Sequence, residues 1–229
     1  MAQPASIVFL VDVDNTLLDN DRIQDDIQKH LEREFGAAAR ARYWRILEDL
    51  MHDLGYRDYL EALQRYRVEH PYEEHLLAMS SYLLDYPFAD RLFPNSLDVL
   101  ARFRTWGRTV ILSAGDVVFQ PRKVERSGIA EAVDGHVLVY VHKERELADV
   151  ARRYPAQHYV FVDDKPRLTA AIKKAWGDKV TTVLPRQGQY AHDPVTLAMR
   201  PAPDHIVERI GELLHSDLHD LLRGSGISA

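Results

Sequence analysis

Short apolar runs and stretches of helical periodicity divide the chain into two patterns. The run from Ile7 to Val11 is β-branched and aromatic and too short for a helix, so it predicts a strand buried on both faces. From residue 95 onward, similar runs alternate with helical stretches: strands are predicted at 109–113, 136–141, 158–163 and 179–184, and helices at 95–106, 117–127, 143–154 and 166–176. This alternation predicts an α/β fold with a parallel sheet and helices on both of its faces.

A continuous block of helical periodicity separates the first strand from this alternating region. Apolar positions three and four residues apart, such as Ile23, Ile27 and Leu31, recur through it without any strand-like alternation. We therefore expect an all-helical domain at residues 20–90, inserted into a core domain made of residues 1–19 and 91–229. A last amphipathic stretch, residues 204–222, predicts a helix that closes the core.

The composition is that of an ordinary globular protein. The 229 residues are 46% hydrophobic and 28% charged, which allows a sizeable core. The formal net charge of −6 is mild and no basic stripe is present, so we expect no nucleic-acid partner. The sequence has no cysteine, which excludes disulfides, thiolate metal sites and cysteine nucleophiles within it. Because no apolar stretch approaches about 18 residues and no signal-peptide pattern is present, we expect a cytoplasmic protein without a membrane partner. The sequence gives no prediction of oligomeric state.

Polar side chains gather where the predicted core strands end. Because the carboxyl ends of parallel strands lie at one edge of a sheet, residues far apart in the sequence can meet there. These residues are Asp12 and Asp14 after the first strand, Ser113 at the end of the second, Lys143 after the third, and Asp163 and Asp164 at the end of the fourth; Ala114, which follows Ser113, adds its backbone N–H. We predict that they form one site.

The residue types at this edge suit phosphate chemistry. Four carboxylates close together repel, so either their pKa values rise or a cation lies among them. Oxygen ligands without cysteine or an evident histidine cluster favour a hard ion, Mg²⁺ above all, which usually also binds a substrate phosphate. The Ser113 hydroxyl, the Lys143 ammonium and backbone N–H groups around Gly115 suit the other phosphate oxygens. One aspartate could attack phosphorus, and a second, two residues on, could protonate the leaving oxygen and then activate water.

Each of these residues also has a simpler interpretation. The alternatives are turn residues or a calcium loop for Asp12 and Asp14, a buried strand-end serine for Ser113, a solvated lysine for Lys143, and helix capping for Asp163 and Asp164. An EF-hand is poorly supported, because Ile23 stands where its closing glutamate is required. Helix capping would need only one of the two acids that end the fourth strand.

Taken in order, the motifs resemble those of the haloacid dehalogenase (HAD) superfamily. Asp12-Val13-Asp14-Asn15-Thr16 is similar to its motif I, and Ser113, Lys143 and Asp163-Asp164 are similar to motifs II, III and IV, each after a strand. The resemblance covers about residues 6–19 and 92–192, and the helical insert takes the place of the family's C1-type cap. It implies a Rossmann-like sheet, Asp12 as nucleophile and Asp14 as general acid/base. It also implies phosphate binding at Ser113, Ala114 and Lys143, and Mg²⁺ bound by the Asp12 carboxylate, the Asp14 backbone carbonyl and Asp163, with Asp164 as the second acid of motif IV.

Within this superfamily, the resemblance implies a Mg²⁺-dependent phosphohydrolase that acts on a small phosphorylated metabolite through an aspartyl-phosphate on Asp12. Dehalogenating members lack the acid found here at Asp14, and phosphonate-cleaving members need a cap lysine, of which the insert has only Lys29. Motif IV is Asp-Asp-Lys, one of two arrangements in the superfamily. The alternatives are a phosphoryl-transfer enzyme such as a phosphomutase, a haloacid dehalogenase-type hydrolase, and a non-catalytic module that binds a phosphorylated ligand.

Overall fold

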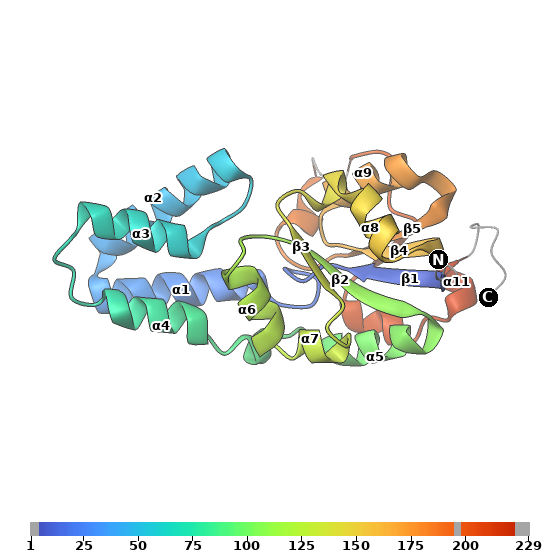
Figure 1. The fold of residues 1–229 in the computed structure, drawn as a ribbon, viewed down its shortest axis with the longest axis horizontal. Helices are drawn as coiled ribbons and strands as arrows, with labels where there is room; N and C mark the ends of the chain where they lie inside the picture. The colour runs from blue at the N-terminus through green and yellow to red at the C-terminus, as the bar shows by residue number, and fades with distance from the viewer. Residues whose placement is uncertain (1–4, 195–197, 223–229) are drawn as a thin grey trace.

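A six-stranded parallel sheet forms the core of the protein in the computed structural model, which describes residues 5–194 and 198–222. The strands are β1 (Ala5–Val11), β2 (Arg108–Ala114), β3 (Val137–Tyr140), β4 (Ala156–Val162), β5 (Val180–Pro185) and β6 (His205–Val207). Their order is β3-β2-β1-β4-β5-β6, so β1 lies inside the sheet between β2 and β4 (Figure 1). This confirms the α/β class predicted from the alternating pattern.

Helices cover both faces of the sheet. The core helices are α5 (Ser96–Trp106), α6 (Phe119–Arg126), α7 (Ile129–Ala132), α8 (Leu147–Arg153), α9 (Pro166–Trp176) and α11 (Leu218–Leu221), and the 3₁₀ turns are η1 (Phe88–Arg91), η2 (Lys143–Arg145), η3 (Gly177–Lys179), η4 (Tyr190–His192) and η5 (Ile210–Leu214). Side chains of β1 alternate between the two faces. Phe9 and Val11 lie in a buried cluster with α5, α7, η5 and α11, whereas Val8 and Leu10 lie in another with α8 and α9. The first strand is therefore buried on both faces, as its apolar run predicted.

Four further helices form a separate lobe beside the sheet (Figure 1). They are α1 (Asn20–Phe35), α2 (Ala37–Leu54), α3 (Tyr59–Glu69) and α4 (Leu76–Asp85), and we call them the helical lobe. Their apolar faces, including Ile23, Ile27 and Leu31 of α1, meet in a buried cluster of their own. Phe119 at the start of α6 joins this cluster, while Val124 of the same helix belongs to a cluster beneath the sheet. Helix α6 therefore packs against both parts of the protein.

The predicted closing helix over residues 204–222 is wrong. This stretch forms β6, η5 and α11 instead. Asp204 explains why a strand begins here in place of a helix. Its Oδ2 accepts hydrogen bonds from the backbone N–H of Thr182 at 2.8 Å and from the Thr182 hydroxyl at 2.9 Å. These bonds hold the chain beside β5, and the β-branched residues that follow extend the sheet. The apolar spacing that suggested a helix comes partly from Ile210 and Leu213 of η5, which are buried in the same cluster as α5.

The helix predicted at 143–154 begins later than expected. Residues 143–145 form η2, and α8 starts only at Leu147. Lys143 therefore lies in a turn soon after β3, and its side chain is buried. A short helix, α7, was not predicted; it follows Gly128, whose φ of 81° ends the preceding helical stretch.

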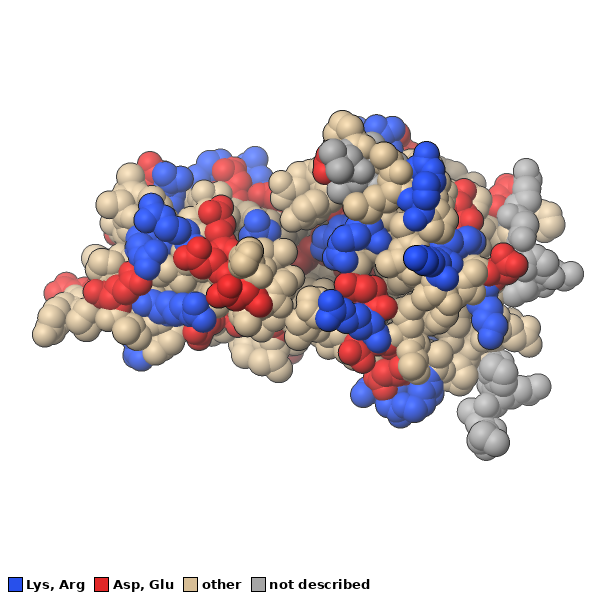
Figure 2. Space-filling model, turned by 90° about the horizontal axis from the view of Figure 1, so that it is seen from above, with Lys and Arg blue, Asp and Glu red and all other residues tan. Residues whose placement is uncertain are grey.

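Among the described residues, no helix combines the length and the apolar character needed to cross a membrane. On the face shown in Figure 2, basic and acidic side chains are interspersed over both the helical lobe and the sheet domain. This face therefore carries no extended area of a single charge.

Candidate active site

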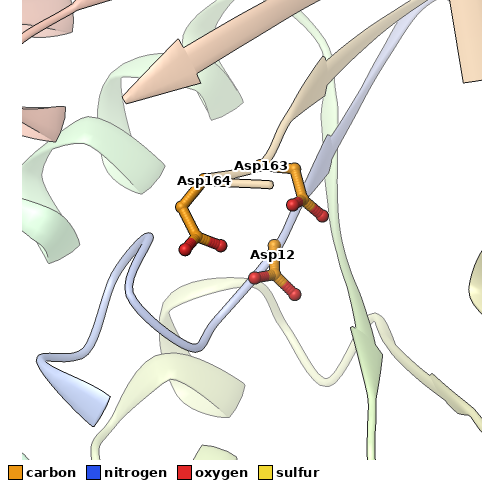
Figure 3. Close-up of side chains that lie close together, drawn as sticks. All are labelled: Asp12, Asp163 and Asp164. Carbon is orange, nitrogen blue, oxygen red and sulfur yellow. The ribbon is translucent and has the colours of Figure 1, made fainter. Parts of the chain in front are cut away.

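Three aspartates meet where β1 and β4 end. Asp12, Asp163 and Asp164 are all buried, and each offers a carboxylate oxygen that lies within 4.8 Å of the others (Figure 3). The strands themselves set this distance, because the Asp12 backbone N–H donates to the carbonyl of Val162 at 2.9 Å. Two motifs 150 residues apart are thus joined by the pairing of neighbouring parallel strands.

Lys143 forms ion pairs with two of these carboxylates, Asp12 and Asp163. Its Nζ donates to Asp12 Oδ1 at 2.5 Å and to the Leu112 carbonyl at 3.0 Å, and it lies 2.6 Å from Asp163 Oδ2. Burial alone would lower the pKa of Lys143, but the charges of Asp12 and Asp163 outweigh it and raise that pKa. The Lys143 side chain is 1% exposed, which excludes the alternative of a solvated lysine.

Asp164 is a buried acid just after the end of β4. Among the described residues, neither of its carboxylate oxygens accepts a hydrogen bond. Burial raises the pKa of Asp164 well above its usual value; Lys165 opposes this shift, while the charges of Asp163 and Asp12 add to it. Such orphaned oxygens suit a hard cation, so the residues present fit Mg²⁺.

Helix capping explains only part of the acid pair. Asp163 Oδ1 accepts the backbone N–H of Lys165 at 2.9 Å, just before Pro166 begins α9. Asp164 contributes no such bond through its side chain. Lys165 itself is partly buried: burial would lower its pKa, but the surrounding aspartates raise it.

The loop after β1 is held in place by its own polar residues. The Thr16 hydroxyl accepts the backbone N–H of Asp164 at 3.1 Å and lies 3.5 Å from Asp12 Oδ2. Asn15 has a φ of 59°, and its Oδ1 accepts the backbone N–H groups of Asn20 and Asp21 at the start of α1. The loop is therefore fixed both to β4 and to the helical lobe.

Asp14 lies apart from the carboxylate cluster. Its Oδ1 accepts a hydrogen bond from Lys123 Nζ at 2.6 Å, and the same Nζ donates to Asn20 Oδ1 at 3.0 Å. The Asp14 side chain is 21% exposed and lines a pocket, whereas Lys123 is 1% exposed. This placement suits proton transfer to a ligand in the pocket. The expected metal contact through the Asp14 backbone carbonyl stays a prediction.

The end of β2 offers a hydroxyl and a backbone turn. Gln120 Nε2 donates to Ser113 Oγ at 2.8 Å, which leaves the hydroxyl hydrogen of Ser113 able to donate to a ligand. Two residues on, Gly115 leaves no room for a side chain, since a Cβ there would lie 2.8 Å from Gln120 Cβ. Ala114, between them, lines the pocket. Ser113 is buried as the simpler interpretation expected, but it is also bonded within the site.

A pocket of about 310 Å³ lies between the helical lobe and the sheet domain. Its walls include Asp14, Ala114, Lys123 and Lys165 from the sheet domain and Gln24, Tyr56 and Arg57 from the helical lobe. Both lobes therefore contribute to the space in which a small substrate would bind.

Two residues of this site were missed from the sequence, Gln120 and Lys123. They lie three residues apart on one face of α6 and contact Ser113 and Asp14 respectively. Nothing in their spacing distinguishes them from the polar face of a surface helix, where lysine is usually found. Only their burial identifies them, and burial depends on how α6 packs between the lobes.

The chain is similar to known hydrolases along most of its length. Residues 8–175 match the family model of the haloacid dehalogenase-like hydrolases. A crystal structure of a haloacid dehalogenase-like hydrolase from Burkholderia xenovorans is 56% identical, with a TM-score of 0.90 over 96% of this chain and 99% of that one. No curated protein matches the chain significantly.

Two more distant structures share the fold. The HAD-hydrolase YfnB from Bacillus subtilis, bound to magnesium, is 15% identical with a TM-score of 0.60, and the match covers 92% of this chain and 97% of that one. L-2-haloacid dehalogenase from Xanthobacter autotrophicus, with chloropropionic acid covalently bound, is 19% identical with a TM-score of 0.59, over 95% and 98% of the two chains. At these identities the likeness extends to the fold alone.

Proposed function

The chain belongs to the haloacid dehalogenase-like hydrolase family, and we propose that it is a Mg²⁺-dependent phosphohydrolase that cleaves a small phosphomonoester. The observation that carries this proposal is the separation of Asp12 from Asp14. Asp12 is buried against Lys143 within the carboxylate cluster, whereas Asp14 faces the pocket and is held by Lys123. A nucleophile and an acid/base group two residues apart, with different surroundings, suit the two steps of phosphoester hydrolysis.

In the first step, a carboxylate oxygen of Asp12 forms a bond to phosphorus while the bond from phosphorus to the leaving oxygen breaks. Asp14 gives a proton to that oxygen, so the leaving group departs as an alcohol. In the second step, Asp14 takes a proton from a water molecule that attacks the phosphorus of the aspartyl-phosphate. The bond from Asp12 to phosphorus breaks, which releases inorganic phosphate and restores the free carboxylate.

The remaining residues would bind the phosphoryl oxygens. Lys143 would supply a buried positive charge, the Ser113 hydroxyl would donate, and the backbone N–H of Ala114, which lies at the pocket wall, would add a second donor. The backbone N–H of Gly115 instead donates to the Tyr140 carbonyl at 3.1 Å. Mg²⁺ bound at Asp12, Asp163 and Asp164 would supply charge neutralisation at those oxygens. We therefore assign it as the cofactor. The cytoplasmic location expected from the sequence stays a prediction.

Asp14 also favours phosphoester hydrolysis over dehalogenation. A halide leaves without needing a proton, so an acid that lines the pocket has no evident use in the displacement step of that reaction. The covalently bound chloropropionic acid of the Xanthobacter autotrophicus enzyme concerns a protein only 19% identical to this one. A leaving alkoxide, in contrast, gains directly from a positioned acid.

The proposal is tested by measuring two products in parallel. Purified protein with Mg²⁺ is incubated with p-nitrophenyl phosphate, with a panel of sugar, nucleoside and hydroxy-acid phosphates, and with 2-chloropropionate. We expect Mg²⁺-dependent release of inorganic phosphate from at least one phosphoester and no chloride from 2-chloropropionate. Release of chloride alone would favour a dehalogenase, and an isomeric phosphoester without free phosphate would favour a phosphomutase. Failure to turn over any compound would favour a binding module; each of these results contradicts the proposal.

A further inference from the structure

Lys123 contacts both the proposed acid/base residue and the helical lobe. We propose that Lys123 is a positioning residue, which orients Asp14 for proton transfer and does so only while the helical lobe is seated against the sheet domain. The inference rests on the proposed function in assigning a proton-transfer role to Asp14. The link between the lobes that it describes can be measured without activity.

The Lys123 ammonium lies between two acceptors from different parts of the fold. It donates to Asp14 Oδ1 at 2.6 Å and to Asn20 Oδ1 at 3.0 Å, and Asn20 is the first residue of α1. Among the described residues, Asp14 Oδ2 accepts no hydrogen bond. One oxygen of Asp14 is thus fixed by Lys123, and the other is left for a ligand in the pocket.

Stability alone explains this lysine poorly. Removing an ammonium from water is costly, and a buried ion pair often stabilises a protein no more than well-packed apolar residues would. Lys123 is 1% exposed, but the carboxylate it holds is exposed to the pocket. Lys123 therefore fixes the orientation of the Asp14 carboxylate at the pocket. An apolar residue at position 123 would not do this.

Helix α6 connects this orientation to the helical lobe. Phe119, one turn before Lys123, packs with its ring centroid 4.6 Å from that of Tyr59 and 5.6 Å from that of Phe88, within the buried cluster of the lobe. The Lys123 Nζ in turn lies 5.4 Å from the centre of the Phe119 ring. Movement of the lobe away from the sheet domain would strain these ring contacts or break the bond from Lys123 to Asn20. Asp14 would then lose its fixed orientation.

The first test uses the leaving group of the substrate. The value of kcat/KM is measured for aryl and alkyl phosphates whose leaving groups range from strongly to weakly acidic alcohols, with Lys123→Met, Asp14→Asn and the control Lys174→Met, which changes an exposed lysine of α9. We expect Lys123→Met to lower kcat/KM about 10²-fold for alkyl phosphates, where protonation of the leaving oxygen matters, and only slightly for dinitrophenyl phosphate. The double variant with Lys123→Met and Asp14→Asn should lose no more kcat/KM than Asp14→Asn alone. An equal loss on every substrate, or no loss, overturns the proposal.

The second test needs no activity. Hydrogen exchange is measured at the amides of Asn20 and Asp21, with the amides of β4 as an internal reference. We expect faster exchange at the start of α1 in Lys123→Met, and a similar rise in Asn20→Ala, which keeps the backbone bond from residue 20 to Asn15 but removes the contact with Lys123. Because Asn20→Ala changes a partly exposed side chain, it serves if Lys123→Met does not fold. Unchanged exchange contradicts the link to the lobe. If the wild-type protein hydrolyses no phosphoester, the proposed function fails. The exchange measurement still shows whether Lys123 links Asp14 to the helical lobe.

Discussion

Asp12 and Asp14 are identical side chains two residues apart, but their surroundings differ. Asp12 is buried and forms an ion pair with Lys143. Asp14 reaches the pocket and forms an ion pair with Lys123. Asp164 differs from both, because its buried oxygens have no partner among the described residues. The roles that we propose for these acids, as nucleophile, proton carrier and metal ligand, therefore follow from differences in their burial and neighbours.

The unpaired Asp164 predicts a metal-dependent change in stability. Saturating Mg²⁺ should raise the melting temperature of the wild-type protein, because binding to the folded state alone stabilises it by about 2.7 kcal/mol at 100 times Kd. In Asp164→Asn the gain should disappear, and without Mg²⁺ this variant should melt no lower than the wild type, since a buried unpaired acid has been removed. Thermal unfolding with Mg²⁺ and with chelator measures both effects. The exposed Asp178→Asn should behave like the wild type, and a Mg²⁺ gain that persists in Asp164→Asn would exclude Asp164 as a ligand.

At the scale of elements, the connections between the lobes matter most. The chain passes from β1 into α1 through the loop that carries Asp12 to Asp19, and it returns from α4 through η1. At the return, Asp26 of α1 accepts hydrogen bonds from the Tyr86 hydroxyl and from the Arg91 guanidinium. This cluster ties the second connection to the first helix of the lobe.

The Asp26 cluster predicts a pH-dependent loss of stability on mutation. Burial tends to raise the pKa of Asp26, but hydrogen bonds from Tyr86 and Arg91 outweigh it, so its folded-state pKa lies below the ordinary value of 3.8. The unfolded chain therefore binds the proton more readily, and this stabilisation is present above about pH 4 and lost as pH falls through the lowered pKa. Asp26→Asn should lower the free energy of unfolding by about 1–3 kcal/mol at pH 7, and by less near pH 3.5.

Urea unfolding at the two pH values measures this difference. The matched control is Asp25→Asn. Among the described residues, the exposed Asp25 carboxylate forms an ion pair with Lys29 of the same helix. An effect of Asp26→Asn that is the same at both pH values would contradict the assigned cause.

The accuracy of sequence-based prediction also differs between elements. The interior strands were predicted closely, because a strand buried on both faces must be apolar throughout, as Ile7 to Val11 is. The edge strand β6 was missed, since it has only three residues and is fixed by Asp204, whose role depends on Thr182 of another strand. Short elements held by such tertiary bonds leave little periodic signal of their own.

At the scale of the whole molecule, the site lies where two lobes meet. The sheet brings motifs from four strand ends together, and topology alone allows that to be predicted, because parallel strands place their carboxyl ends on one edge. The pocket could not be predicted in this way. Its walls include Tyr56 and Arg57 from the helical lobe, and its shape depends on how the lobes pack. The same packing buries Lys123 and Gln120, which explains why both residues were missed.

The central claim is that Asp12 carries the phosphoryl group during hydrolysis, and trapping this intermediate tests it most directly. Protein with Mg²⁺ and dinitrophenyl phosphate is quenched in acid, digested and examined by mass spectrometry. We predict one phosphoryl group on the peptide that contains Asp12, more of it in Asp14→Asn, where water is not activated, and none in Asp12→Asn, whose turnover should fall on the order of 10³-fold or more. A phosphoryl group on another residue, or undiminished turnover by Asp12→Asn, would contradict the claim.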